Sequence, residues 1–368
     1  MIPVYKPMLT KKSREYLIDA YDTTWISSQG KYKDFVEEKF SKILSVEKES
    51  LFLCSNGTTA MHLCCLALKL KYPNVKRILV PDNVYVAAWN TFLINPIYDL
   101  VPVSANKLTW NIDLNDLENK IQKDDCVLIV HNIGGIINVP ELQRKYKDCI
   151  FIEDNCEGIF GNYESKMTGT ASFCSAFSFF GNKTITSGEG GLFYCKDKNI
   201  TKEIKKMHGQ GMSNTRYIHD VLGFNYRMTN LQAAILLGQL DSIEKIIERK
   251  SNIWEKYNKA FKHYSKEIQL QHQEEECKNA QWIYPAMLKN KKAKDLIEFL
   301  KENNIDSRPM FYPMSHHKHL KQYSNKKGET NAKYINEKVI MLPSYPDMSE
   351  LEVEKVISNV VSFITKKG

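Results

Sequence analysis

The chain has 368 residues, of which 43% are hydrophobic and 26% are charged. This composition is typical of a globular protein with a sizeable core, and it excludes a disordered chain, a fibrous repeat and a coiled coil. The net charge of +8 is spread along the chain, which argues against a nucleic-acid-binding protein. No run of about 18 apolar residues occurs, and the first residues lack the apolar core of a signal peptide. We therefore expect neither a membrane span nor a secretion signal.

The nine cysteines form no C-x-x-C pair, and most lie inside apolar runs. They are residues 54, 64, 65, 126, 149, 156, 174, 195 and 277. This pattern predicts reduced, buried thiols in a cytoplasmic protein. Neither the cysteines nor the nine histidines have the spacing of zinc ligands, so we expect no metal site.

From residue 50 the sequence alternates between two kinds of segment. Short β-branched runs occur at 51–54, 78–81, 98–103, 126–131 and 149–153, and helix-like segments at 58–71, 83–94, 113–122 and 140–147. This alternation predicts an α/β fold with a mostly parallel sheet. Two further runs, 172–179 and 191–195, flank a glycine-rich turn.

A long amphipathic helix is predicted over 231–249, with Asn230 as its N-cap. The following part reads as a smaller α+β unit, with a strand near 281–287, a helix near 292–303, a proline-punctuated loop at 309–313 and a final helix near 349–364. The sequence thus predicts a large α/β domain over 1–248, which includes an N-terminal arm, and a small C-terminal α+β domain over 249–368.

Two strand ends carry candidate binding residues. In residues 54–62 (CSNGTTAMH) a strand ends, a small polar turn follows and a helix begins. Free N–H groups at such a helix start favour a phosphate, although the same residue types are ordinary helix caps. In residues 150–155 (IFIEDN) an apolar strand ends in two acids. Ligands of α/β sheets bind at the carboxyl ends of strands, so Asp154 either faces a ligand or is an ordinary turn acid.

Lys183 lies in a loop rich in Gly, Ser and Thr between two apolar strands, and no charged residue follows it until Glu189. A lysine held in a cleft can act as a nucleophile or a base. The glycines do not form the G-x-G-x-x-G pattern of a dinucleotide site.

Three motifs together resemble one enzyme family. They are EDNCEG at 153–158, SFFGNKTITSGEGG at 178–191 and GFNYRMTNLQAA at 223–234. They are similar to the pyridoxal-phosphate-dependent sugar aminotransferases of the DegT/DnrJ/EryC1/StrS family, which have the aspartate aminotransferase fold, PLP fold type I. The resemblance starts at residues 24–30 (TWISSQG) and extends to residues 342–344 (LPS).

The resemblance implies a role for each matching residue. Lys183 matches the Schiff-base lysine, which also moves a proton, and Asp154 matches the acid that keeps the pyridine nitrogen protonated. Glu157 matches the residue that contacts the ring hydroxyl, and Tyr85 matches the aromatic side chain that stacks on the ring. The phosphate cradle matches Gly57, Thr58 and Ser178. Asn225 matches a residue that reaches the phosphate of the neighbouring subunit, which implies a homodimer with its active site at the interface.

The resemblance also implies the substrates, an amino donor L-glutamate and a nucleotide-linked 4-keto-6-deoxyhexose. The WISS-x-G start and the FFGNK motif are most similar to the branch that aminates C4 of GDP-4-keto-6-deoxymannose. Phe180 stands where many other 4-aminotransferases of the family carry a histidine, which favours the same branch. The alternative is a dTDP- or UDP-linked 4-keto-6-deoxyglucose, which gives a viosamine-type product.

Substrate contacts are expected from residues scattered along the chain. They are Trp25, Ser27, Asn182, Tyr312 and His316. His316, His317 and His319 either contact the sugar or diphosphate or form an exposed polar loop. The family-level expectation for the product is surface polysaccharide such as O-antigen.

A non-catalytic regulator with the same fold is the alternative of another class. It predicts loss of the lysine or the acid, and both Lys183 and Asp154 are present.

Overall fold

The computed structural model describes residues 1–324 and 330–366. Within these residues the largest sheet has seven strands in the order β1-β9-β8-β5-β4-β2-β3. The strands are β1 (Leu51–Cys54), β2 (Arg77–Pro81), β3 (Asp99–Val103), β4 (Cys126–Val130), β5 (Ile150–Asp154), β8 (Cys174–Ser178) and β9 (Gly191–Cys195). Only β9 runs antiparallel to its neighbours β1 and β8 in this sheet as described. The predicted α/β fold with a mostly parallel sheet is confirmed.

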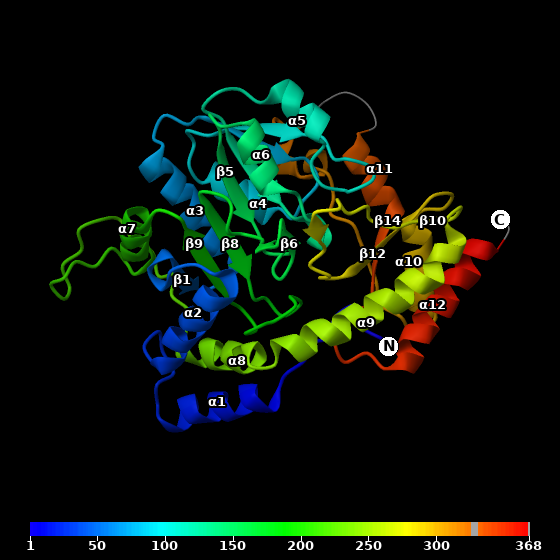
Figure 1. Ribbon diagram of the computed structural model, residues 1–368, viewed down its shortest axis with the longest axis horizontal. Helices are drawn as coiled ribbons and strands as arrows, with labels where there is room; N and C mark the ends of the chain where they lie inside the picture. The colour runs from blue at the N-terminus through cyan, green and yellow to red at the C-terminus, as the bar shows by residue number, and fades with distance from the viewer. Residues whose placement is uncertain (325–329, 367–368) are drawn as a thin grey trace.

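Helices cover this sheet (Figure 1), and its strands are therefore buried along nearly their whole length. They include α3 (Gly57–Lys71), α4 (Ala87–Leu93), α5 (Leu114–Lys120), α6 (Val139–Lys145) and α7 (Lys198–His208). The four helices predicted between strands are confirmed, although α4 begins four residues later than expected, since residues 83–86 form the connection from β2. Helix α7 was not predicted.

Two helices near the N-terminus, α1 (Lys11–Asp22) and α2 (Lys31–Leu44), were also not predicted. Both pack against α8 (Asn230–Leu240), and Figure 1 shows α1 lying along α8 at the lower edge of the molecule. The chain before α1 crosses to the C-terminal part, where Ile2 pairs with Ile305 in a parallel bridge.

The single helix predicted over 231–249 is wrong. The structure has two helices, α8 and α9 (Ile243–Phe261), separated at Asp241 and Ser242 (Figure 1). Ser242 leaves helical geometry, with φ −121° and ψ 16°, while Asp241 pairs with Lys39 and accepts the hydroxyl of Tyr16 at 2.7 Å. These partners come from distant helices, so no local pattern indicates the break.

The predicted N-cap Asn230 is also wrong, because the cap is Thr229. Thr229 and Gln232 form a reciprocal capping box, which satisfies the first turn of α8. The side chain of Asn230 instead accepts the N–H of Tyr32 at 3.0 Å and donates to the carbonyl of Trp25 at 2.7 Å.

The C-terminal part contains a second, antiparallel sheet in the order β10-β12-β14-β13. Its elements are β10 (Ile268–Gln269), β12 (Tyr284–Leu288), α10 (Ala293–Glu302), β13 (Arg308–Pro309), α11 (Asn331–Lys338), β14 (Val339–Leu342) and α12 (Glu350–Thr365). The predicted strand and both predicted helices are confirmed, and the predicted loop at 309–313 begins with the last residue of β13. The predicted boundary at 248/249 falls within α9, and the division into domains stays a prediction.

A third sheet joins β6 (Asn162–Tyr163) to β7 (Lys166–Met167) and β11 (Cys277–Lys278). Segments before and after α9 therefore contribute strands to the same sheet. Short 3-10 turns occur at Lys48–Ser50, Asn132–Gly134, Lys262–Tyr264, Met314–His316 and Lys318–Leu320. No helix in the described ranges is long and apolar enough to cross a bilayer.

Candidate active site

A cavity of about 310 Å³ lies at the carboxyl edge of the parallel strands, where the loops after β1, β5 and β8 meet. The predicted site residues that line it are Gly57, Thr58, Tyr85, Asp154, Glu157, Ser178, Asn182 and Lys183. Residues far apart in the sequence therefore converge on one space, as expected for a ligand site of an α/β sheet.

The start of α3 forms one wall of the cavity. Asn56 caps the helix by accepting the N–H of Thr59 at 2.9 Å, so the ordinary capping interpretation of this motif is correct. The amides of Gly57 and Thr58 precede any helical acceptor and remain available to an anion. A Cβ on Gly57 would lie 2.7 Å from Cβ of Ser178, so only glycine fits at this close approach. The cradle thus suits a phosphate group.

Asp154 ends β5, between Val130 of β4 and Ala176 of β8. Its Oδ1 accepts the N–H of Cys156 at 3.1 Å, and the side chain lines the cavity. Tyr85 also lines the cavity, with 59% of its surface exposed and its ring centroid 5.9 Å from that of Phe311. A carboxylate and an aromatic face on one cavity match the groups that a pyridinium ring requires.

Lys183 reaches the same cavity from the turn after β8, which is closed by its N–H on the carbonyl of Phe180 at 2.9 Å. Its Nζ lies 3.8 Å from Oε1 of Glu157 and 4.0 Å from the ring centroid of Trp282. The lysine therefore has a carboxyl group and an aromatic face as neighbours.

Glu157 is held by the turn that follows β4. Its Oε2 accepts the N–H of Ile133 at 2.8 Å, and Ile133 has φ +54°, which is strained for a β-branched residue. Burial raises the pKa of Glu157 to about 7, although Lys183 acts in the opposite direction. A carboxyl group that titrates near neutral pH thus lies beside the candidate nucleophile.

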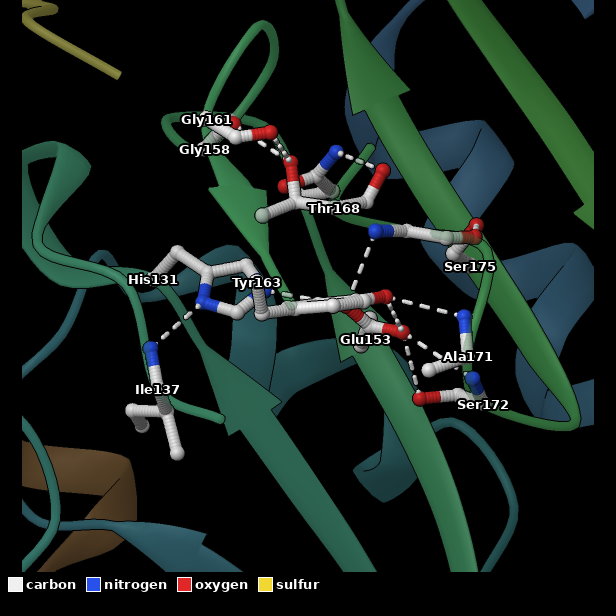
Figure 2. Close-up of polar contacts among 12 residues, drawn as sticks. His131, Ile137, Glu153, Gly158, Gly161, Tyr163, Thr168, Ala171, Ser172 and Ser175 are labelled. Atoms are coloured by element: carbon white, nitrogen blue, oxygen red, sulfur yellow. Dashed lines mark hydrogen bonds and ion pairs between the residues drawn. The ribbon is translucent and has the colours of Figure 1, made fainter. Parts of the chain in front are cut away.

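Behind Asp154, on the other face of β5, Glu153 is fully buried in a hydrogen-bond network (Figure 2). Its carboxylate accepts hydrogen bonds from His131 at 2.9 Å, from the amide of Gly169 at 2.8 Å, and from Ser172 and Tyr163. Burial alone would raise the pKa of Glu153, but the hydrogen bonds, foremost that from His131, lower it below its usual range.

His131 connects this network to the turn at Ile133. Its Nδ1 accepts the N–H of Ile137 at 3.3 Å, so Nε2 is the N–H donor to Glu153; Figure 2 shows both contacts. His131 thereby contacts both ends of the segment 131–137, which presents the Ile133 amide to Glu157.

Other predicted residues lie outside the cavity. Asn225 is exposed and accepts from Arg227 at 3.2 and 3.3 Å. Trp25 and Ser27 lie against the start of α8, where their carbonyls accept from Asn230. Tyr312 and His316 are exposed, with ring centroids 5.5 Å apart. Their roles stay predictions.

Sequence reasoning missed two side chains that bind the lysine turn from outside. Trp282 donates its indole N–H to the carbonyl of Asn182 at 2.8 Å, and Tyr5 donates its hydroxyl to the carbonyl of Lys183 at 2.5 Å. Trp282 precedes a buried strand and reads as an ordinary core residue, and Tyr5 lies in a segment without periodicity. No local signal indicates either contact.

The fold and the site together define an aminotransferase of fold type I, in which pyridoxal phosphate fits the phosphate cradle, the aspartate and the lysine. The chain belongs to the DegT/DnrJ/EryC1/StrS aminotransferase family, whose profile matches residues 7–361. It is accordingly a pyridoxal-phosphate-dependent sugar aminotransferase.

Individual relatives match along nearly the whole length. The chain is 33% identical to the GDP-perosamine synthase of Escherichia coli O157:H7, over 100% of this chain and 99% of the relative. It is also 33% identical to the GDP-perosamine synthase of Vibrio cholerae, over 99% of each chain. Among solved structures, E. coli GDP-4-keto-6-deoxy-D-mannose-3-dehydratase with bound hydrated PLP superposes with a TM-score of 0.89 at 20% identity, covering 98% of this chain and 99% of that chain.

Proposed function

We propose that the enzyme transfers the amino group of L-glutamate to C4 of GDP-4-keto-6-deoxymannose and so forms GDP-perosamine. The observation that carries the proposal is the meeting of Lys183, Asp154 and Glu157 with the α3 cradle in one cavity. The similarity to GDP-perosamine synthases over the whole chain supports this sugar nucleotide rather than a dTDP- or UDP-linked glucose derivative.

Each residue has a distinct task in this proposal. Gly57, Thr58 and Ser178 bind the phosphate, and Tyr85 stacks on the ring. Asp154 holds a proton at the pyridine nitrogen, and Glu157 contacts the ring hydroxyl. Bound pyridoxal phosphate supplies an electron sink for the carbon that loses its proton. Lys183 holds the cofactor covalently and, when its Nζ is free, carries the proton between donor carbon and cofactor.

We further propose a homodimer with Asn225 at the interface. The segment 209–226 extends away from α7 at the side of the molecule (Figure 1) and exposes Tyr217 and Leu222 by 74% and 82%. Asn225 follows these residues and lies outside the cavity of its own chain, which suits a residue that acts on a neighbouring subunit. Large exposed apolar side chains on one segment support burial against a second copy.

A cytoplasmic location belongs to the same proposal. All nine cysteines are free thiols and most are buried, which is the usual state in a reducing compartment.

A spectroscopic half-reaction tests the substrate. The enzyme is loaded with pyridoxal phosphate, converted with glutamate to the amine form, and freed of glutamate. GDP-4-keto-6-deoxymannose or dTDP-4-keto-6-deoxyglucose is then added separately. We expect the absorbance of the aldehyde-loaded enzyme to return with the GDP sugar alone. Return with the dTDP sugar alone would place the enzyme in the viosamine branch.

The variant Lys183→Ala is the control for the assigned lysine. It should bind the cofactor noncovalently and lose turnover, because Lys183 is the lysine among the residues that line the described cavity. Turnover at the wild-type rate would remove Lys183 from the mechanism.

A further inference from the structure

The turn that carries Lys183 is fixed at two successive carbonyls by side chains from opposite ends of the chain. Trp282 binds the carbonyl of Asn182 and Tyr5 binds that of Lys183. The turn itself contributes only one backbone bond, from the N–H of Lys183 to Phe180. The two external donors therefore bind carbonyls that the backbone bond of the turn does not use.

Both donors meet at a third side chain, Lys250 of α9. Its Nζ donates to the carbonyls of Trp282 at 2.8 Å and of Ser344 at 2.9 Å, and lies 5.3 Å from the ring centroid of Tyr5. Lys250 is only 1% exposed, and it has no carboxylate within 4.0 Å in the described part of the chain. The amine of Lys250 thus joins the backbone at Trp282 to the backbone at Ser344 in a buried cluster.

Trp282 also contacts Lys183 directly. The indole is 4% exposed, and its face lies 4.0 Å from Nζ of Lys183 inside the cavity. A cation over a desolvated indole face is attracted by the ring quadrupole, and Trp is the strongest such partner. Oε1 of Glu157 lies 3.8 Å from the same Nζ.

We propose that Trp282 is a positioning residue for Lys183: its N–H fixes the turn, and its ring face holds the lysine ammonium whenever Nζ is not bonded to the cofactor. Lys250 anchors Trp282 by donating a hydrogen bond to the backbone carbonyl of Trp282. The inference rests on the proposed role of Lys183.

Two variants separate the ring face from the N–H. Trp282→Phe keeps an aromatic face but loses the bond to Asn182, whereas Trp282→Leu loses both. Trp254→Leu is the matched control, since Trp254 is similarly buried at 7% but packs on Tyr284, outside the cavity. The three variants separate a local effect on Lys183 from general loss of packing.

The first readout is the rate of the glutamate half-reaction, measured in single turnover against glutamate concentration. Trp282→Leu should lower the limiting rate by about 10-fold while the half-saturating glutamate concentration changes little. Trp282→Phe should have an intermediate rate, because it keeps the ring face but loses the N–H bond to Asn182, and Trp254→Leu should resemble the wild type. Equal rates in the two leucine variants would overturn the proposal.

The second readout needs neither the donor nor the cofactor. The cofactor-free protein is treated with an amine-acylating reagent, and labelling of Lys183 is followed by peptide mass spectrometry. Trp282→Leu should change the labelling rate of Lys183 by about 10-fold relative to Trp254→Leu, because the ammonium loses its aromatic neighbour. An unchanged labelling rate would also overturn the proposal. If the wild type does not react with glutamate, the proposed function fails, and this second readout still decides the role of Trp282.

Discussion

The carboxyl group of Glu157 lies 3.8 Å from the ammonium group of Lys183, while its second oxygen accepts the amide of Ile133 at 2.8 Å. One oxygen thus faces the reactive side chain and the other is anchored to a strained turn. His131, two residues before Ile133, is hydrogen-bonded to the buried Glu153 at 2.9 Å. The backbone amide that holds Glu157 thus lies two residues from a side chain of the buried network.

The stability of the cofactor-free protein should depend on pH through Glu157. Its pKa is about 7 in the folded chain and 4.5 in the unfolded reference, so the folded state holds the proton more tightly. The free energy of unfolding should therefore fall by up to about 3 kcal/mol as pH rises from about 4.5 to 7, and not change further above that.

Denaturant unfolding of Glu157→Gln across this pH window checks the prediction. The variant should lack this component of the pH dependence, whereas Glu15→Gln, on the exposed face of α1, should follow the wild type. Identical pH profiles for Glu157→Gln and the wild type would contradict it.

Glu153→Gln should destabilise the protein by about 3 kcal/mol or more. The carboxylate only accepts hydrogen bonds, from His131, Gly169, Ser172 and Tyr163, and an amide would place its own N–H groups against these donors. Because the pKa of Glu153 is lowered, its contribution is present above about pH 4.5 and is lost as pH falls further.

Denaturant unfolding near pH 7 measures this effect. Tyr163→Phe keeps the ring but removes the hydroxyl that donates to Glu153 and accepts the N–H groups of Thr170 and Ala171, and it should cost about 1–3 kcal/mol. A Glu153→Gln variant as stable as the wild type would show that the network tolerates an amide.

Asp154→Asn should lower turnover on the order of 100-fold or more, because a neutral amide does not hold the pyridine nitrogen protonated. Asp154 accepts only the N–H of Cys156 from the described chain, so the amide should not disturb the fold. Turnover is compared with cofactor affinity, which the phosphate cradle should largely preserve. A rate close to that of the wild type would show that the acid has another task.

Lys250→Met should remove a second pH dependence, in the alkaline range. Burial lowers the pKa of Lys250 to about 7 from 10.5, so the unfolded chain binds the proton more tightly than the folded chain. The free energy of unfolding should rise by up to about 4 kcal/mol between pH 7 and 10 in the wild type. Deprotonation of Lys250 should preserve its hydrogen bonds to the carbonyls of Trp282 and Ser344, because a neutral amine still has two hydrogens.

The measurement is denaturant unfolding of Lys250→Met at several pH values in this range. Lys256→Met is the matched control on the same helix, because Lys256 is exposed and pairs with Glu350. If the free energy of unfolding of Lys250→Met rises with pH as steeply as that of the wild type, the pH dependence belongs to another group.

The sequence by itself determined the class of fold and the centre of the site. Strands such as Ile150–Asp154 are short apolar runs with polar ends, and the helix at Gly57 follows a capping motif. Local sequence patterns therefore predict both elements. Asp154 and Lys183 were predictable because each occurs at a strand end or in a turn within a motif that resembles the family.

Only the tertiary structure decided what holds those residues in place. Asp241, at the break between α8 and α9, binds Lys39 and Tyr16, and the turn at Lys183 binds Tyr5 and Trp282. In each case the partners lie far apart in the sequence. Periodicity and turn chemistry report the conformation of neighbouring residues, whereas a contact between distant segments is fixed only when the sheet and its covering helices have packed.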